Sequence, residues 1–174
     1  MKYQIFDDFL DKKTFKNLQN TFLSADFPWY LNKSKVLKNQ FSNKIFDFQF
    51  THTFYNNYFP TSSYIEVINP LIEKINPAAI LRIKANLTTS TSEKVVYGMH
   101  TDYGEIDKKY FSGKTAVFYI NTNNGTTVFQ DGSEVESVEN RLIIFDSRMP
   151  HSGTSCTNEK YRTVLNLNFF EWEM

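Results

Sequence analysis

The hydrophobic residues in the first part of the chain have the spacing of amphipathic helices. After a short strand at Tyr3–Phe6, the pattern predicts a helix that Asp11 caps and that runs to about Leu23. A second helix is predicted to begin at Ser62 or Ser63. The buried stripes expected on the two helices are Phe15, Leu18 and Phe22 on the first, and Ile65, Ile68, Leu71, Ile72 and Ile75 on the second. Each helix therefore has one face to bury.

From Ile80 onward the hydrophobic positions follow the two-residue period of strands, as an earlier segment, Lys44–Phe54, also does. The strands predicted after the second helix are Ile80–Leu87, Val95–Asp102, Thr115–Asn121, Thr126–Gln130, Glu134–Ser137, Arg141–Asp146 and Tyr161–Phe170. Polar loops are predicted at Thr88–Lys94 and Asp107–Gly113, and a turn at Asn123–Gly125. This order indicates an α+β fold: a double-stranded β-helix (jelly roll) of about eight antiparallel strands with N-terminal flanking helices.

The length of 174 residues favours a single domain over 1–174. We expect helical support over about residues 1–79 and a jelly-roll core over about residues 80–170. The 17 Phe, 10 Tyr and 2 Trp residues fit a β-rich core, because aromatic side chains pack well on pleated surfaces. The chain is long enough to bury such a core without disulfide bonds.

The charge balance and the cysteine content limit which classes of partner and which cellular compartment are expected. Nineteen basic and nineteen acidic residues cancel, so nothing supports nucleic acid as a partner. The apolar runs are too short to cross a membrane, and the N-terminus does not resemble a signal peptide. The single cysteine, Cys156, excludes an internal disulfide and is expected to be a non-catalytic thiol. A cytoplasmic location is therefore expected, and the oligomeric state stays open.

Two histidines and an aspartate form the candidate metal site. His100 and Asp102 are two residues apart, so on a strand their side chains point to the same face. His151 follows the predicted strand Arg141–Asp146, which can lie close to the first strand in a jelly roll. Two imidazoles and one carboxylate are the facial triad of non-haem Fe(II) oxygenases. An H-x-D pair alone arises by chance in about one such sequence in three, so the prediction depends on all three residues.

The same three ligand types also occur in hydrolytic zinc sites. The chain has no helical H-E-x-x-H arrangement with a glutamate base, and this favours iron. The competing interpretation is a surface H-T-D turn with an unrelated second histidine. His52 is expected to be a structural or surface histidine rather than a ligand, because the triad is complete without it.

Arg162 is the candidate anion-binding residue. On the predicted strand Tyr161–Phe170, one face carries Arg162, Val164, Asn166 and Asn168, and the other carries Thr163, Leu165, Leu167 and Phe169. The second face is expected to pack under the helices and the first to line the barrel. A buried arginine needs an anionic partner, and no acidic residue shares its face, so a carboxylate ligand is expected. The alternative is an exposed arginine at a strand start.

Four further residues are candidates for the same anion pocket. Tyr119 shares a strand face with Thr115, and its hydroxyl group could donate to the carboxylate of the ligand. Tyr97 points away from the metal ligands in a regular strand, and only a bulge, for instance at Gly98, would turn it into the pocket. Asn86 lies on an unexpectedly polar face of its strand, where it could contact the ligand or be solvated.

The chain resembles the 2-oxoglutarate/Fe(II)-dependent oxygenase superfamily, which includes the prolyl hydroxylases. The pattern H-x-D, then H, then R matches His100, Asp102, His151 and Arg162. The segments Thr115–Asn121 and Arg141–Asp146 resemble the strand after the H-x-D motif and the strand before the distal histidine, and Gln4–Leu10 is similar to the start of such domains. The match covers about residues 80–170, and the chain as a whole is similar to small members of the superfamily found in phages and bacteria. One departure is Asn140-Arg141, which stands where a glycine often begins the strand.

This resemblance implies a dioxygenase with Fe(II) held by His100, Asp102 and His151. It also implies 2-oxoglutarate as cosubstrate, with its far carboxylate at Arg162 and Tyr119. O2 is the oxidant, ascorbate is a candidate reductant, and succinate and CO2 are released as an unactivated C–H bond is hydroxylated. The retained Asp102 favours hydroxylation or a related oxidation over halogenation. The substrate is expected to be a peptidyl residue or a small molecule.

Two other classes of protein stay open. One is a jelly-roll metal hydrolase or isomerase that uses the same ligands without 2-oxoglutarate. The other is a non-catalytic binding module that has kept the fold. Fold alone does not choose among them, because function depends on the site.

Overall fold

The computed structural model describes residues 3–35, 45–102 and 113–172. Within these ranges the chain forms, in order, β1 (Tyr3–Phe6), α1 (Lys12–Phe22), β2 (Tyr30–Asn32), β3 (Gln49–Asn56), β4 (Phe59–Pro60), α2 (Ile65–Ile75), β5 (Ala79–Thr89), β6 (Lys114–Tyr119), β7 (Asn123–Phe129), β8 (Glu134–Ser137), β9 (Leu142–Asp146), β10 (His151–Gly153) and β11 (Tyr161–Phe170). Neither helix is long and apolar enough to cross a membrane.

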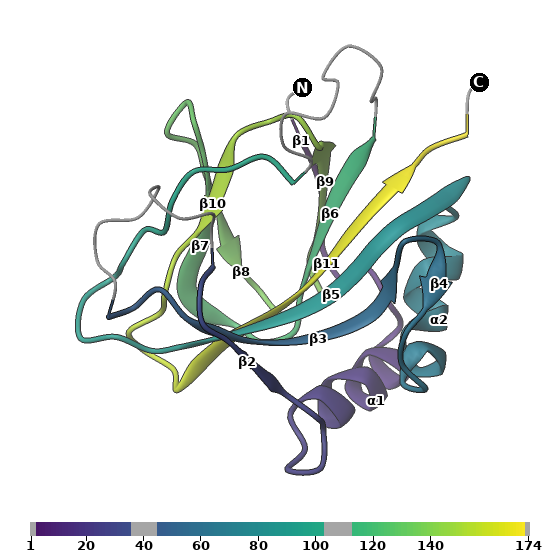
Figure 1. Cartoon of the computed structure of the whole chain (residues 1–174), viewed down its shortest axis with the longest axis horizontal. Helices are drawn as coiled ribbons and strands as arrows, with labels where there is room; N and C mark the ends of the chain where they lie inside the picture. Colours follow the sequence, from purple (N-terminus) through teal and green to yellow (C-terminus); the bar gives the residue numbers. More distant parts are fainter. Residues whose placement is uncertain (1–2, 36–44, 103–112, 173–174) are drawn as a thin grey trace.

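The strands form two antiparallel sheets that enclose the interior of the barrel (Figure 1). The large sheet has the order β1-β9-β6-β11-β5-β3-β2, with β4 paired to β3, and the small sheet has the order β10-β7-β8. The two helices lie together on the outer face of the large sheet, and the small sheet lies on its other side (Figure 1). This arrangement is a jelly roll with N-terminal helices, so the predicted α+β fold class is confirmed.

The helices form where capping and hydrophobic spacing predict them. The carboxylate of Asp11 accepts hydrogen bonds from the backbone N–H groups of Lys13 and Thr14, both at 3.0 Å, and so caps α1. The second helix begins at Ile65 rather than at the predicted serines, because the Ser62 hydroxyl group caps the preceding turn through the N–H of Tyr64. Both helices keep the predicted buried stripe toward the sheet.

Hydrophobic clusters on both faces of the large sheet follow the alternation predicted for β11. The outer cluster lies between the sheet and the helices, and it includes Leu165, Leu167 and Phe169 with Phe15, Leu18, Phe22, Ile68 and Leu71. The inner cluster lies inside the barrel, and it consists of Val117, Tyr119, Phe129, Val135, Ile143, Phe145 and Val164. Odd positions of β11 therefore support the helices, and even positions face the barrel interior.

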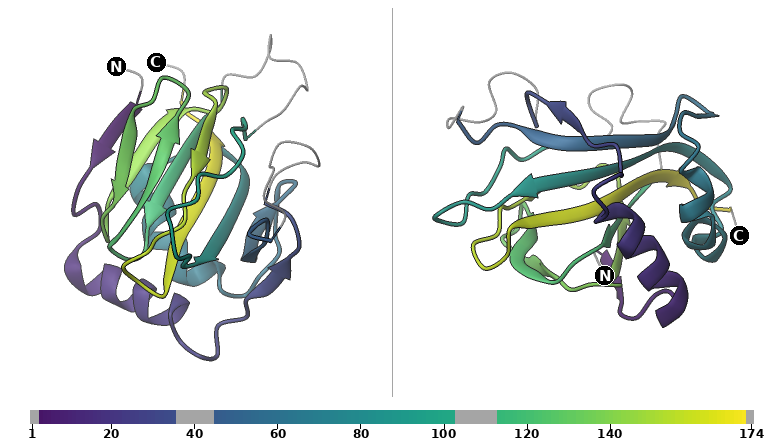
Figure 2. Two further views of the ribbon diagram at one scale, coloured as in Figure 1. Left: turned by 90° about the vertical axis from the view of Figure 1, so that its left-hand side faces the viewer. Right: turned by 90° about the horizontal axis from the view of Figure 1, so that it is seen from below.

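Some predicted boundaries are wrong. The segment Val95–Asp102 is not a regular strand: it pairs with β10 and the residues after it only through the single bridges Val96–Thr154 and His100–His151 (Figure 2, left). The predicted turn at Asn123–Gly125 belongs to β7, and the chain bends at residues 120–121 instead. The strand predicted from Lys44 begins only at Gln49, because residues 45–48 form a turn and an irregular segment. Lys44 itself and most of the predicted loop Asp107–Gly113 lie outside the described residues.

Asn140 explains the departure from glycine before β9. Its φ angle is 62°, in the left-handed region that glycine adopts readily and asparagine tolerates better than most residues. The side-chain amide also exchanges two hydrogen bonds with the backbone of Leu10, at 2.9 and 2.8 Å. Asparagine therefore makes the turn that glycine would make, and it also ties β9 to the start of α1.

Candidate metal centre and anion pocket

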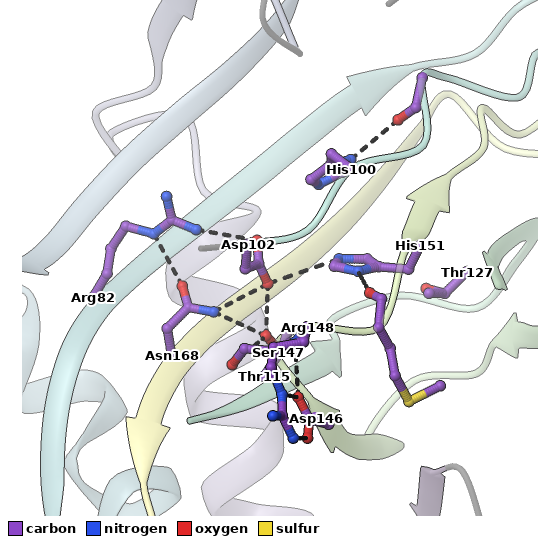
Figure 3. Close-up of polar contacts among 12 residues, drawn as sticks. Arg82, His100, Asp102, Thr115, Thr127, Asp146, Ser147, Arg148, His151 and Asn168 are labelled. Carbon is purple, nitrogen blue, oxygen red and sulfur yellow. Dashed lines mark hydrogen bonds and ion pairs between the residues drawn. The ribbon is translucent and has the colours of Figure 1, made fainter. Parts of the chain in front are cut away.

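The side chains of His100, Asp102 and His151 converge inside the barrel. One donor atom from each residue lies within 4.8 Å of the other two. The two histidines exchange backbone hydrogen bonds at 3.0 and 2.9 Å, and the Asp102 carboxylate lies 3.7 Å from Nε2 of His151 (Figure 3). This trio could hold a metal ion, and it consists of the residues that the H-x-D and distal histidine motifs predict.

Both imidazole rings are oriented by backbone carbonyl groups. Nδ1 of His100 lies 3.1 Å from the carbonyl oxygen of Gly98, and Nδ1 of His151 lies 3.0 Å from that of Met149. A carbonyl oxygen only accepts, so each Nδ1 carries the proton and each Nε2 is left with a lone pair. Burial, and then the charge of His151, lower the pKa of His100. The neutral imidazole that binds metals is therefore favoured.

Three polar residues from neighbouring strands hold the carboxylate of Asp102 (Figure 3). Arg82 on β5 donates to Oδ1 at 3.2 Å, and Thr115 on β6 and Asn168 on β11 donate to Oδ2 at 2.8 and 3.0 Å. Arg82 pairs with Asn168, and Asn168 with Thr115, in the sheet register. One rung of the large sheet therefore supplies all three donors, and we call it the aspartate rung.

These contacts keep Asp102 ionised. Burial alone would raise its pKa, but the charges of His151, Arg82 and His100 and the hydrogen bond from Thr115 together lower the pKa to about 2. The sequence pattern had placed Thr115 in the anion pocket. The structure instead places its hydroxyl group on the carboxylate of Asp102, because Thr115 belongs to the same rung as Asn168.

Arg162 is buried, with 6% of its surface exposed. Its Nε donates to the Ser137 hydroxyl group at 2.8 Å, and its Nη2 donates to the Thr127 hydroxyl group at 3.2 Å. Tyr119 lies beside it, with its ring centroid 5.6 Å from the guanidinium carbon and its hydroxyl group donating to Thr127 at 2.8 Å. Among the described residues, no carboxylate forms an ion pair with Arg162. Since a buried cation needs an anion, the pocket is suited to an acidic ligand.

Two glycines leave the space that the Arg162 side chain occupies. A Cβ atom at Gly125 would lie 2.7 Å from Cδ of Arg162 and 3.0 Å from the backbone oxygen of Ser155. A Cβ atom at Gly153 would lie 3.3 Å from Nη1 of the same arginine. A side chain at Gly125 would therefore displace the arginine, and one at Gly153 would be in tight contact with it.

The segment that carries Tyr97 has the kind of irregularity that the prediction requires. Between the bridges Val96–Thr154 and His100–His151, one strand advances four residues and the other three, so one extra residue lies between them. Tyr97 is buried on the same side as the arginine, whose charge acts on its pKa after burial and a hydrogen bond with Ser155. Burial raises the pKa of Tyr97 to about 12. Its contact with a cosubstrate remains a prediction.

Two asparagines of the barrel interior have an unsatisfied amide oxygen. The Oδ1 atoms of Asn86 on β5 and Asn166 on β11 are buried and have no hydrogen-bond partner among the described residues. Such atoms cost free energy unless a ligand or water satisfies them. Asn86 was predicted to contact the ligand, and this geometry supports the prediction without testing it.

The roles of four residues of the site were not predicted from the sequence, although Arg82, with Asn86, was recognised as part of an unexpectedly polar strand face. The four residues are Arg82 and Asn168, which bind Asp102, and Thr127 and Ser137, which bind Arg162. The unusual polarity of the face that carries Arg82 was a readable signal for the first pair. No signal marked Thr127 and Ser137, because they lie on β7 and β8 of the opposite sheet.

The remaining histidine and the cysteine lie outside the metal centre. Nδ1 of His52 is 2.9 Å from the carbonyl oxygen of Pro28, and Nε2 is 2.7 Å from the Ser62 hydroxyl group. Cys156 is buried, and burial raises the pKa of its thiol, so it is a poor nucleophile. Hydrogen bonds therefore hold His52 in the fold, in keeping with the structural role expected for it, and a non-catalytic Cys156 stays a prediction.

No protein-family model matches this sequence, and no curated protein matches it. Solved structures do match. The chain has the fold of the 2-oxoglutarate/Fe(II) oxygenases, the class that contains the prolyl hydroxylases.

Three solved structures illustrate this likeness. The viral collagen prolyl hydroxylase of Paramecium Bursaria Chlorella virus-1, in complex with 2-oxoglutarate, has a TM-score of 0.65 at 15% identity, over 97% of this chain and 95% of that one. The Trichoplax adhaerens prolyl hydroxylase, in complex with a peptide fragment of hypoxia inducible factor, has a TM-score of 0.67 at 14% identity, over 98% and 84%. The non-haem α-ketoglutarate-dependent epimerase SnoN of nogalamycin biosynthesis has a TM-score of 0.64 at 11% identity, over 98% and 76%. At identities this low, the structural likeness shows the fold alone. Hydroxylases and an epimerase share this fold.

Proposed function

We propose that this protein is an Fe(II)- and 2-oxoglutarate-dependent dioxygenase that hydroxylates an unactivated C–H bond. The observation that carries the proposal is the placement, in one barrel, of a His-Asp-His trio and a buried arginine without an acidic partner. The first could hold the metal through His100, Asp102 and His151. The second, Arg162, could hold the far carboxylate of 2-oxoglutarate.

The residues present fit a redox iron better than a hydrolytic zinc. Two neutral imidazole nitrogens and one ionised carboxylate are the donor set of the facial triad. A hydrolytic zinc site also needs a general base near its water, and Asp102 is the only carboxylate that approaches either histidine among the described residues. When bound, the iron would supply the activation of O2, coupled to oxidation of 2-oxoglutarate to succinate and CO2.

The chain's own residues supply positioning and shielding. The aspartate rung would fix the carboxylate of Asp102 before the metal arrives. The far carboxylate of the cosubstrate would meet Arg162, with hydroxyl groups of Tyr119 and Thr127 beside it. The ring of Phe145 lies 4.8 Å from that of His151, and with the rest of the inner cluster it keeps bulk water from this side.

The substrate we propose is a peptidyl residue or a small molecule. Two neighbours in fold were solved with 2-oxoglutarate or with a peptide, and this supports the class without selecting a member. We further propose a cytoplasmic protein with ascorbate as an optional reductant, and a single domain over residues 1–174. The packing of α1 and α2 on β11 supports that single domain.

An anaerobic titration tests this function. Wild-type protein with Fe(II) is expected to develop a weak visible absorption band when 2-oxoglutarate is added, and to release succinate once air is admitted. His100→Ala is expected to abolish both, because one of three metal ligands is lost. His52→Ala serves as the control, since it removes a structural histidine and should leave the band unchanged.

The other classes predict different results. Tight metal binding without affinity for 2-oxoglutarate would favour the hydrolase or isomerase. Absence of metal binding in folded wild-type protein would favour the non-catalytic binding module. An unchanged band in folded His100→Ala would show that the metal site is assigned wrongly.

Gly125→Ala tests the space around Arg162. The added methyl group cannot fit between the arginine and the Ser155 carbonyl group, so the arginine must shift. We expect a stability loss of about 1–3 kcal/mol, as is typical of overpacking. Affinity for 2-oxoglutarate should fall at least about tenfold, the equivalent of 1.4 kcal/mol, with Fe(II) affinity unchanged in calorimetric titrations.

Gly132→Ala is the matched control. Gly132 has a φ angle of 83°, but a Cβ atom there meets nothing within 4 Å. This variant should lose stability through strain, about 1 kcal/mol, and keep its affinity for 2-oxoglutarate. Equal losses of affinity in the two variants would attribute the effect to general destabilisation.

A further inference from the structure

Lys84 lies on the rung of the large sheet next to the aspartate rung. It is two residues beyond Arg82 on β5, so its side chain points to the same face of the sheet. In the register it pairs with Asn166 on β11 and with Thr53 on β3. Lys84 therefore lies between the rung that holds Asp102 and the pocket around Arg162.

The charges that act on Lys84 are those near the metal ligands, at one end of the interval between the aspartate rung and the Arg162 pocket. Burial lowers the pKa of its ammonium group to about 8, and the charges that act on it next are those of Arg82 and Asp102. The charge of Lys84 also acts on His100. Arg162 is not among the groups that perturb it. By the sheet register, Lys84 therefore lies toward the metal end of this interval and Arg162 toward the other end.

Lys84 has no partner of its own among the described residues. Its ammonium group forms no ion pair or hydrogen bond with them, and the carboxylate of Asp102 is bonded by Arg82, Thr115 and Asn168 instead. The amide oxygen of the neighbouring Asn166 is also without a partner among the described residues. An ammonium group and an amide on one rung are a suitable pair of donors for a carboxylate, since an amide can be turned to present its nitrogen.

We propose that Lys84 binds the carboxylate of 2-oxoglutarate that lies beside the metal, so that a cation holds each end of the cosubstrate. This inference rests on the proposed function, which supplies the 2-oxoglutarate. Arg162 binds the far carboxylate, and Lys84, assisted by Asn166, binds the near one. One consequence is specific to this arrangement: part of the affinity for 2-oxoglutarate does not depend on the metal.

Metal-free protein and three ligands test the assignment. The ligands are 2-oxoglutarate, 4-oxopentanoate, in which a methyl group replaces the near carboxylate, and 2-oxopentanoate, in which a methyl group replaces the far one. Binding is measured by calorimetry in the presence of a chelator. Lys84→Met should weaken 2-oxoglutarate and 2-oxopentanoate at least about tenfold, as expected for a charge-assisted hydrogen bond, and leave 4-oxopentanoate unchanged.

Arg162→Met should give the opposite pattern, weakening 2-oxoglutarate and 4-oxopentanoate but not 2-oxopentanoate. Lys84→Arg should recover part of the lost affinity, because it restores the charge. Lys160→Met, at an exposed position, is the matched control and should change none of the three affinities. Circular dichroism and thermal midpoints establish that each variant is folded.

Three results would overturn the assignment of Lys84. They are an unchanged affinity of Lys84→Met for 2-oxoglutarate, an equal loss for all three ligands, and wild-type metal-free protein that binds 2-oxoglutarate no more tightly than 4-oxopentanoate. Failure of the proposed function looks different, because wild-type protein loaded with Fe(II) would then also fail to bind 2-oxoglutarate. If loaded wild-type protein binds it and Lys84→Met binds it equally well, only the inference on Lys84 fails.

Discussion

Asp102→Ala is expected to lose more than about two orders of magnitude in affinity for Fe(II). The substitution removes the only carboxylate of the trio and leaves two neutral imidazoles, which hold a divalent cation weakly. Changes in groups that merely orient a metal ligand already cost about 10- to 100-fold, so loss of the ligand itself should cost more. Titration of Fe(II) under anaerobic conditions, followed by calorimetry, measures the effect.

Two variants calibrate this result. Thr115→Val removes one of three donors to the Asp102 carboxylate and keeps the ligand, so a loss of about tenfold is expected. Asp146→Ala removes a more exposed carboxylate that pairs with Arg148, and Fe(II) affinity should stay at the wild-type value. Asp102→Ala protein that is folded and binds Fe(II) like wild type would show that the metal is held elsewhere.

Arg162→Met is expected to weaken 2-oxoglutarate by at least about 30-fold in the Fe(II)-loaded protein. Truncating one partner of a buried charge pair costs about 2–5 kcal/mol, and 2 kcal/mol corresponds to about 30-fold. Fe(II) affinity without 2-oxoglutarate should be unchanged, because Arg162 bonds Ser137 and Thr127 rather than any ligand of the metal. Parallel titrations with the metal and the cosubstrate separate the two effects.

The folding of Arg162→Met should be nearly unaffected. Methionine fills much of the volume, and the guanidinium group that is lost has no acidic partner among the described residues. We expect a free energy of unfolding within about 1 kcal/mol of wild type, since surveys of buried ionic groups find that apolar replacement is often neutral. Arg141→Met removes an arginine that is paired with Asp7, and 2-oxoglutarate affinity should not respond. A wild-type affinity in folded Arg162→Met would make the arginine structural.

The periodicity of the sequence predicted features that lie within a single helix, strand or extended segment, such as which side chains share a face. The alternation of β11 correctly separated Leu165 and Leu167, which pack under the helices, from Arg162 and Val164, which face the barrel. The spacing of the H-x-D motif placed His100 and Asp102 near each other even though their segment is not a regular strand. Local rules were sufficient there because the chain is extended in both cases.

The sequence did not predict which residues on different strands lie next to each other. Arg82, Asn168 and Thr115 lie on three different strands, and only the register of the sheet makes them one rung on Asp102. A shift of one residue would turn each side chain to the other face, and a single sequence does not reveal such a shift. The bulge near Gly98 is a similar case. The sequence indicates that Tyr97 needs a bulge to turn toward the pocket, but only the spacing of the two bridges in the structure shows that an extra residue is present.

The close approach of Gly125 to Arg162 links two positions that are 37 residues apart in the chain. Natural variation at one should be constrained by the other, so relatives that keep the arginine are expected to keep a glycine opposite it. A relative with a side chain at position 125 is expected to have a different residue at position 162, because that side chain would overlap Arg162. An alignment of relatives should therefore show correlated changes at positions 125 and 162, so that the residue at position 125 is as informative about anion binding as the residue at position 162.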